Sequence, residues 1–282
     1  MKSENERFWN ELSSSEEIDL DDEKINRILR WRALEPHLKG VKTILDVGAG
    51  TGAFSIPLAE RGFDVTHLDI SDEMLQCAQD KAHSLRTIRF YKRDAADLHC
   101  FEDNVFDLVI SFDGAVSFSG HSANQVIAEA CRVGKKLILT VSNQGCMVAA
   151  WLNYSLSKLH RIHPSVMAMI ETGYFNKADY NDAEVLTSIA ELKAYSPEEL
   201  TQILEQNDML VKECRSIGSL THLYLFHLYR QGDQSTTSGM LNALAEQSDF
   251  VDLCDQFDRI LMPHGMGSFR RAGLLAVAEK RN

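Results

Sequence analysis

The stretch VKTILDVGAGTGAFSIPLAERG, residues 41–62, decides the fold. In it an apolar run ends in three alternate glycines, Gly48, Gly50 and Gly52, and then gives way to a helix-like pattern. Glycines at a strand-to-helix turn let bare backbone approach a ligand at the carboxyl end of a sheet. The turn alone does not identify the ligand, because the same pattern also satisfies a dinucleotide-binding fingerprint when Ala53 is taken in the place of its last glycine.

Strand-like and helix-like segments alternate from residue 41 to residue 143. The apolar runs are TILDV, FDVTHLDI, TIRFYKRD, FDLVISF and KKLILTVS. Helices are expected at about residues 52–61, from Ser71 onward and within HSANQVIAEACRVG. This alternation indicates an α/β fold with a doubly wound, mostly parallel sheet that carries helices on both faces.

The flanking segments predict additions to this core. Residues 1–40 have helical spacing and are expected to form a cap, and residues 144–191 are expected to form an inserted helical lid without strands. Residues 192–282 are expected to complete the core with a helix capped by Ser196 and strands near MLVKECRSI and AGLLAVAEK, which gives seven strands. The stretch THLYLFHLYRQ, residues 221–231, fits either a helix or a strand.

The bulk composition narrows the class of protein. The 282 residues carry a net charge of −12 without a block of basic residues, which makes nucleic acid an unlikely partner. The six cysteines are far apart and lack metal-ligand spacing, so no metal is expected. The first residues lack a signal-peptide pattern and no apolar run is long enough to span a bilayer, so we expect a cytoplasmic protein without a membrane partner. The oligomeric state is not indicated.

Asp46, two residues before the glycine turn, separates two ligand classes. A dinucleotide would place its anionic pyrophosphate over the turn, where a carboxylate would repel it. S-adenosylmethionine carries an ammonium and a sulfonium and no phosphate, so Asp46 favours that ligand. Asp69, 19 residues beyond Gly50, is placed to bind a ribose in either ligand, or to cap the helix that follows. Asp94 is placed to bind adenine, or to cap a turn.

These pieces, in this order, resemble the class I S-adenosylmethionine-dependent methyltransferases, in particular the small-molecule group. The resemblance covers residues 41–143, and more loosely SPEELTQILEQNDMLV and GLLAVAEK. It implies a Rossmann-like seven-stranded sheet whose last strand runs antiparallel between the fifth and sixth. It also implies S-adenosyl-L-methionine as cofactor and S-adenosyl-L-homocysteine as product.

The resemblance assigns cofactor-binding residues by position. They are Asp46, Gly48, Ala49, Gly50 and Gly52 at the methionine end, Asp69 at the ribose, Ile70 and Met74 packed on the ribose or adenine, Asp94, Ala95 and Ala96 at the adenine, and Ser111 beside the methionine portion. The N-terminal cap of this family often covers the cofactor, and Phe8, Trp9 and Trp31 are the candidates here, although each is equally well explained as core.

The expected reaction is methyl transfer to a small-molecule acceptor by in-line displacement, which mainly requires donor and acceptor to be held in line. A hydroxyl acceptor needs a base, for which Asp113, His121 and His222 are the candidates. Two alternatives stay open: an NAD(P)-dependent oxidoreductase with the same fold, and a non-catalytic S-adenosylmethionine-binding module. The sequence does not decide the acceptor atom.

Overall fold

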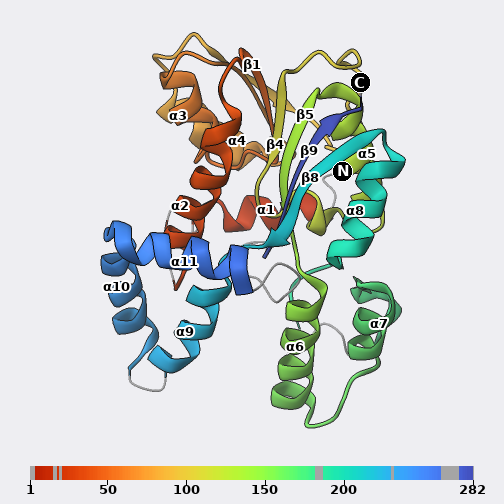
Figure 1. The fold of residues 1–282 in the computed structure, drawn as a ribbon. Helices are drawn as coiled ribbons and strands as arrows, with labels where there is room; N and C mark the ends of the chain where they lie inside the picture. The colour runs from red at the N-terminus through yellow and green to blue at the C-terminus, as the bar shows by residue number, and fades with distance from the viewer. Residues whose placement is uncertain are drawn as a thin grey trace.

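A seven-stranded sheet forms the centre of the molecule (Figure 1). The computed structural model describes residues 4–14, 18, 21–181, 187–229, 232–261 and 273–281. The strand order is β3-β2-β1-β4-β5-β9-β8. The strands are β1 (Thr43–Val47), β2 (Asp64–Asp69), β3 (Ile88–Lys92), β4 (Leu108–Ser111), β5 (Lys136–Val141), β8 (Met209–Ser216) and β9 (Leu274–Lys280). Strands β1 to β5 pair in parallel, and β9 runs antiparallel between β5 and β8, which confirms the predicted fold class.

Helices cover both faces of this sheet because its strands are apolar on both sides. Leu45 and Val109 face one side and pack with α5 (Ala123–Val133) and α8 (Pro197–Gln206). Ile44 and Leu108, their neighbours in sequence, face the other side and pack with α2 (Glu23–Leu34) and α3 (Ser55–Glu60). All four side chains are fully buried. The alternation follows from the two-residue repeat of a strand.

Two helices begin where the sequence predicts. Ser71 caps α4 (Asp72–Lys81) by accepting a hydrogen bond from the Met74 amide, and Ser196 caps α8 by accepting one from the Glu199 amide. These hydroxyls satisfy amides that have no partner within the helix. Helix α3 begins at Ser55, later than the expected start near residue 52, because the glycine turn extends further.

The segment after β5 forms a separate lobe. It contains α6 (Gln144–Tyr154), the π-helical turn η3 (Ser155–Leu159), α7 (Pro164–Thr172), β6 (Tyr174–Asn176), η4 (Lys177–Asp179) and β7 (Glu191–Lys193). The prediction that this segment holds no strand was wrong, since β6 and β7 pair antiparallel. Strands of three residues are too short to produce a recognisable alternation of apolar and polar residues. We call residues 144–172 the α6–α7 lobe.

A second helical addition lies between β8 and β9. It consists of α9 (Ser219–Tyr229), α10 (Gln234–Leu244) and α11 (Ser248–Leu261), so the stretch left open between helix and strand is helical up to Tyr229, and Arg230 and Gln231 lie outside the described residues. The sequence analysis did not predict this addition within residues 192–282. In Figure 1 it and the α6–α7 lobe extend from the same end of the sheet.

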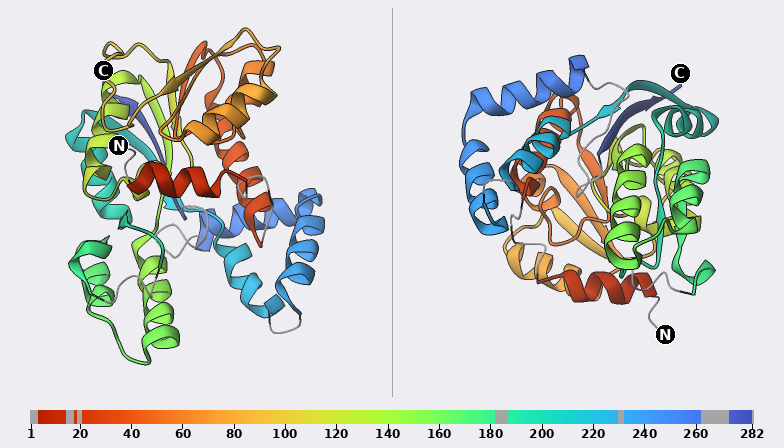
Figure 2. Two further views of the ribbon diagram at one scale, coloured as in Figure 1. Left: turned by 180° about the vertical axis from the view of Figure 1, so that it is seen from behind. Right: turned by 90° about the horizontal axis from the view of Figure 1, so that it is seen from below.

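The N-terminal helix crosses that same end. Helix α1 (Glu4–Leu12) lies across the strand ends, as both views of Figure 2 show. Glu6 pairs with Lys92 at 2.8 Å, and Asn10 accepts a hydrogen bond from the Ser71 hydroxyl at 2.6 Å. The chain then passes through α2 and the short helix η1 (Glu35–His37) into β1. None of the helices in the described part of the chain is long and apolar enough to cross a membrane.

Candidate functional site

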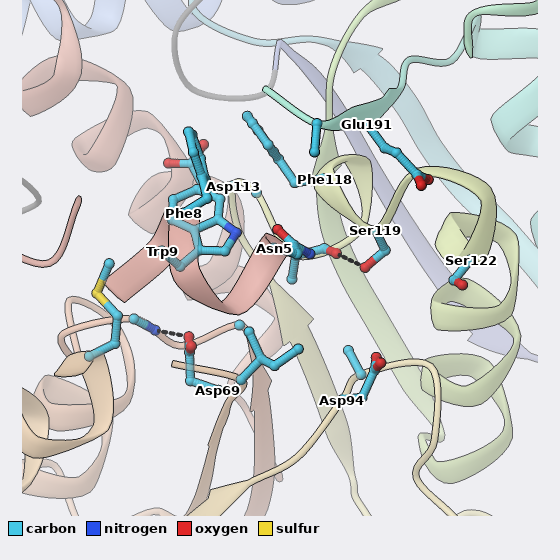
Figure 3. A pocket seen from close by; sticks show the side chains of 18 of the residues that line it. Asn5, Phe8, Trp9, Asp69, Asp94, Asp113, Phe118, Ser119, Ser122 and Glu191 are labelled. Carbon is cyan, nitrogen blue, oxygen red and sulfur yellow. Dashed lines mark hydrogen bonds between the residues drawn. The ribbon is translucent and has the colours of Figure 1, made fainter. Parts of the chain in front are cut away.

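A cavity of about 300 Å³ lies at the carboxyl ends of the parallel strands, beneath α1. In Figure 3 Asp69 and Asp94 lie on one side of it, and Phe118 and Glu191 lie on the other. The carboxyl edge at the point where strand order reverses is where ligands bind in doubly wound sheets. Strands β1 and β4 are neighbours in this sheet, and the cavity opens above them.

The structure brings most of the predicted residues to this cavity. On its wall are Phe8, Trp9, Gly48, Gly50, Asp69, Ile70, Met74, Asp94, Ala95, Asp113 and His121. The other predicted residues are not among those that line it: Trp31, Asp46, Ala49, Gly52, Ala96, Ser111 and His222. The wall residues come from seven separate segments, so the fold and not local sequence assembles the site.

The glycine turn needs its glycines for two different reasons. Gly48, Gly50 and Gly52 have φ of 70°, 56° and 94°, a backbone region that side chains disfavour. A Cβ added at Gly48 would lie 2.3 Å from the Cβ of Ala115, so that position has no room for a side chain. A Cβ at Gly50 would meet nothing within 4 Å, because that residue faces open space at the cavity. Gly50 therefore offers bare backbone to a ligand.

Asp69 joins the end of β2 to this turn. One carboxylate oxygen accepts a hydrogen bond from the Gly50 amide and the other accepts one from the Ser71 amide, each at 2.8 Å. Burial raises the pKa of Asp69, and the two amides oppose that shift. Both carboxylate oxygens retain further lone pairs, so ribose hydroxyls can still donate to them.

Asp46 lies behind the turn and not on the cavity wall. Burial, and secondly the charge of nearby Asp69, raise the pKa of Asp46 to about 8, although the Ser55 amide opposes the shift. Its Oδ2 atom is buried without a hydrogen-bond partner. Beside it on β2, His67 accepts or donates a 2.7 Å hydrogen bond with the Ser55 hydroxyl, and burial lowers its pKa to about 4. Asp46 therefore does not face the cavity, and no sequence pattern pointed to His67.

Asp94 and Ser111 organise the backbone beside the cavity. The Asp94 carboxylate accepts a hydrogen bond from the Ala96 amide at 2.9 Å, so it caps the turn after β3 while it also lines the wall. The Ser111 hydroxyl donates to the Val47 carbonyl oxygen at 3.1 Å and is buried. Ser111 therefore ties β4 to the end of β1 instead of facing the cavity.

Aromatic residues of α1 close one side of the cavity. Phe8 stacks on Phe118 with ring centroids 5.9 Å apart, and Trp9 meets the same ring edge-on at 5.1 Å. A Cβ at Gly114 would lie 2.6 Å from the Trp9 ring, so this glycine admits the indole. Trp31, in contrast, stacks on Phe54 in the core between α2 and the sheet.

Asp113 is held by the N-terminal segment. Its carboxylate pairs with Arg30 of α2 at 3.3 Å, and its amide donates to the Thr140 hydroxyl at 2.9 Å. The φ of Asp113 is 75°, a strained value for a residue with a side chain. Because the guanidinium of Arg30 already occupies one of its oxygens, Asp113 suits charge balance better than proton transfer.

A polar cluster that the sequence analysis missed lies opposite Asp69. The Glu191 carboxylate on β7 accepts hydrogen bonds from the His121 amide at 3.1 Å and the Tyr174 hydroxyl at 3.1 Å. Its Oε2 atom also lies 2.8 Å from Nδ1 of His121, in the short helix η2 (Ser117–Ser122). Burial would raise the pKa of Glu191, but the hydrogen bonds and charge of His121 and the bond from Tyr174 lower it.

Gly120 makes this cluster possible. Its φ is 53°, and a Cβ there would lie 2.1 Å from the Glu191 carboxylate. The glycine is visible in the sequence, but its partner comes from the other side of the α6–α7 lobe, 71 residues later. Only the fold could reveal the contact.

His222 is held away from this cluster. It lies on α9, with Nε2 3.9 Å from the Cys146 sulfur on α6, and burial lowers its pKa. The structure does not bring it to the cavity wall. Of the three bases that the sequence suggested, His121 alone combines a place on the wall with a carboxylate on Nδ1 that leaves Nε2 to accept a proton.

The wall is predominantly anionic. It carries five carboxylates against one guanidinium, that of Arg93. The carboxylates are those of Glu4, Asp69, Asp94, Asp113 and Glu191. Such a wall favours a cationic ligand. Among the described residues, no three His, Cys, Asp or Glu side chains are grouped to hold a metal ion.

Known proteins resemble this chain mainly in the core of the fold. Residues 44–136 match a family model described as a methyltransferase domain. The Bacillus subtilis protein YqeM is 44% identical over 81 residues, which are 29% of this chain and 32% of that protein. Demethylmenaquinone methyltransferase of Renibacterium salmoninarum is 38% identical over 112 residues, 38% of this chain and 44% of that protein. The chain thus matches less than half the length of either relative.

The whole fold also has a solved counterpart. A crystal structure of a SAM-dependent methyltransferase from Methanosarcina mazei superposes with a TM-score of 0.54 at 20% identity, over 88% of this chain and 96% of that one. At this identity the likeness establishes the fold.

Proposed function

We propose that this chain, whose residues 44–136 form a class I S-adenosylmethionine-dependent methyltransferase domain, transfers a methyl group to a small-molecule acceptor. One observation carries the proposal: bare backbone at Gly50 adjoins Asp69 in a cavity whose wall holds five carboxylates and one guanidinium. That wall suits a cationic nucleoside and disfavours a diphosphate. The NAD(P)-dependent alternative would require anionic phosphates at this same wall.

The residues on the wall fit the cofactor. Gly48 and Gly50 would accommodate the methionine portion against main chain, Asp69 would accept hydrogen bonds from the ribose, and Asp94 with the Ala95 amide would bind the adenine edge. Ile70 and Met74 add apolar surface beside the ribose and adenine. When bound, S-adenosylmethionine supplies a methyl group activated by its sulfonium.

Residues behind the wall support this arrangement without touching the ligand. Asp46, near Ser55, and Ser111, bonded to Val47, hold the glycine turn and the end of β1 in place. Ala49, Gly52 and Ala96 belong to the same backbone turns, at which the wall residues are presented. Their contribution to cofactor binding is therefore to shape the turns.

The acceptor side is formed by η2, β7 and α1. Phe8, Trp9 and Phe118 would hold an apolar part of the acceptor. His121 is placed to take the proton that an acceptor hydroxyl or ammonium group loses, because Glu191 fixes its Nδ1 side. Holding the acceptor atom in line with the methyl group, about 3 to 3.5 Å away, is the main catalytic requirement.

The chain divides accordingly. Residues 1–40 would cover the cofactor through α1, residues 41–143 would bind it, residues 144–191 would cover the acceptor, and residues 192–282 would complete the sheet and add α9–α11. The proposal concerns this chain alone.

The test uses S-adenosylmethionine with an isotopically labelled methyl group. The purified chain is incubated with fractionated metabolite extracts, and small molecules that gain the label are identified by mass spectrometry. The proposal predicts a labelled compound that is absent with Gly50→Ala protein. Binding of S-adenosylmethionine without any labelled product would favour the non-catalytic binding module.

A further inference from the structure

We propose that the tip of the α6–α7 lobe, residues 155–167, docks onto the surface of an anionic lipid bilayer. The inference does not rest on the proposed function. It rests on three features of the tip: exposed apolar side chains, a turn that holds Ile162 pointing outward, and a local charge opposite in sign to the net charge of the chain.

Large apolar side chains are exposed on the lobe. Leu156 and Ile162 at the tip are 47% and 63% exposed, and Met167 in the first turns of α7 is 50% exposed. Ile170, 48% exposed, lies farther along α7, where its carbonyl oxygen accepts a hydrogen bond from Gln144 at the start of α6. On α7, Val166 and Met169 face inward and fill the core of the lobe together with Trp151. Met167 and Ile170 therefore lie on the face that the lobe does not need for its own packing. Exposed apolar groups gathered in this way mark an interaction surface.

Hydrogen bonds hold the turn that connects η3 to α7. The Ser155 hydroxyl donates to the Arg161 carbonyl oxygen and accepts a 2.6 Å hydrogen bond from the His163 amide. The His163 side chain is buried and accepts a hydrogen bond from the Ser165 amide at the start of α7. Ile162, between these two anchored residues, is consequently held pointing outward.

The charge of the lobe departs from that of the chain. The lobe holds one acidic residue, Glu171 near the end of α7, although the whole chain carries 41 acidic residues and a net charge of −12. Its basic residues are Lys158 and Arg161, which are exposed at the tip beside His160. Cations that surround exposed apolar side chains are the pattern of a segment that binds an anionic membrane interface.

A lipid surface fits the tip better than another protein does. A stable protein interface buries about 800 Å² on each partner, more than Leu156, Ile162 and Met167 at the end of a lobe provide. In Figure 1 the turn between α6 and α7 is the far end of the lobe, away from the sheet. Helix α6 has 11 residues, so the lobe would lie in the interface and not span it. This proposal departs from the expectation of no membrane partner, which was drawn from the lack of a signal-peptide pattern and of a spanning segment.

The lobe that docks also contacts the cavity wall. Phe118 packs against the core of the lobe and also lines the cavity, and Ile189 does the same. A lobe anchored in the interface would therefore connect one wall of the cavity to the docked tip.

The experiment is co-sedimentation of the full chain with vesicles of phosphatidylcholine alone, and with vesicles of phosphatidylcholine and phosphatidylglycerol in equal amounts. We expect binding to the anionic vesicles that K158E/R161E weakens about thirtyfold, because each cation near such a surface contributes to binding. Ile162→Asp should weaken binding about tenfold through lost apolar burial. Far-UV circular dichroism and the urea unfolding midpoint should be unchanged in both variants, which shows that they are folded.

Matched controls separate the tip from general effects of charge and apolar surface. K39E/R86E makes the same change of net charge at exposed positions outside the lobe. Ile260→Asp replaces a 71% exposed apolar residue on α11. Both should bind vesicles as the unaltered chain does. Equal binding to both vesicle types, equal loss in the control variants, no vesicle binding, or sedimentation without vesicles through self-association would each overturn the proposal.

Discussion

The Gly50 amide donates a 2.8 Å hydrogen bond to the Asp69 carboxylate, which lies 19 residues later at the end of the neighbouring strand. The same carboxylate also accepts a hydrogen bond from the Ser71 amide, so one side chain holds both the glycine turn and the start of α4 in place. A ligand bound at the turn would therefore be positioned by the same contact as a ligand group bound at Asp69. In the proposed function, Asp69 would both support the loop and bind the ligand.

Asp69→Asn should weaken S-adenosylmethionine binding by about 1.5 to 3 kcal/mol, because charged hydrogen bonds are lost and an amide group faces a backbone N–H. Calorimetric titration measures the dissociation constant. Asp80→Asn, an exposed carboxylate on α4, serves as control and should bind as the unaltered chain does. An unchanged dissociation constant for Asp69→Asn would remove Asp69 from the ligand site.

Gly50→Ala should abolish measurable cofactor binding, because its Cβ would occupy open space on the cavity wall. Backbone strain accompanies the change and costs about 1 to 2 kcal/mol of stability. Gly62→Ala is the matched control. Gly62 also has a positive φ of 92° and room for an added Cβ, but it does not line the cavity. Comparable loss of stability in both variants, with binding lost in Gly50→Ala alone, is the expected result; equal binding in the two would contradict it.

Asp46→Asn should alter the pH dependence of stability. The folded pKa of about 8 lies above the ordinary pKa of 3.8 for an aspartate, so the folded state retains a proton that the unfolded state loses. Stability from this group is full below the unfolded pKa and is lost as pH rises toward 8, by about 1.4 kcal/mol per pH unit for one proton. Between pH 6.5 and 8, His67 is neutral in the folded state, since its pKa is about 4.

Urea unfolding across that pH range checks this expectation. The unfolding free energy of Asp46→Asn should gain on that of the unaltered chain as pH rises. Parallel curves would mean that Asp46 is ionised in the folded chain.

His121→Gln should lower kcat by about 10²- to 10⁴-fold once an acceptor is identified, and should leave the S-adenosylmethionine dissociation constant unchanged. Tyr174→Phe, which removes one donor to Glu191 but keeps His121, should reduce kcat less. Steady-state kinetics with the labelled methyl donor measures both variants. Full activity of His121→Gln would assign proton acceptance to water or to the acceptor itself.

The sequence predicted the parts of the site that are local. The glycine turn, Asp69 and Asp94 each follow directly on a strand, so their place at one sheet edge can be deduced from the strand pattern. Strands β1, β4, β5 and β9 could be predicted because each is largely apolar. Strands β3 and β8 carry charged residues within an otherwise strand-like pattern.

The parts that depend on distant contacts were not predicted. Glu191 and Tyr174 lie on three-residue strands and meet His121 only through Gly120. The burial of Asp46 behind the turn depends on α3 and β2 packing around it, and a residue letter carries no record of that. Helix α9 is apolar on nearly all sides, so it lacks the one-sided spacing that would identify a helix.

Calorimetric titration of the purified chain with S-adenosylmethionine, and separately with NAD⁺ and NADP⁺, tests the central claim that this cavity takes a cationic nucleoside. Saturable binding of S-adenosylmethionine that weakens in Asp69→Asn, with no heat from either dinucleotide, is the predicted result. Saturable binding of a dinucleotide, with none of S-adenosylmethionine, would contradict it.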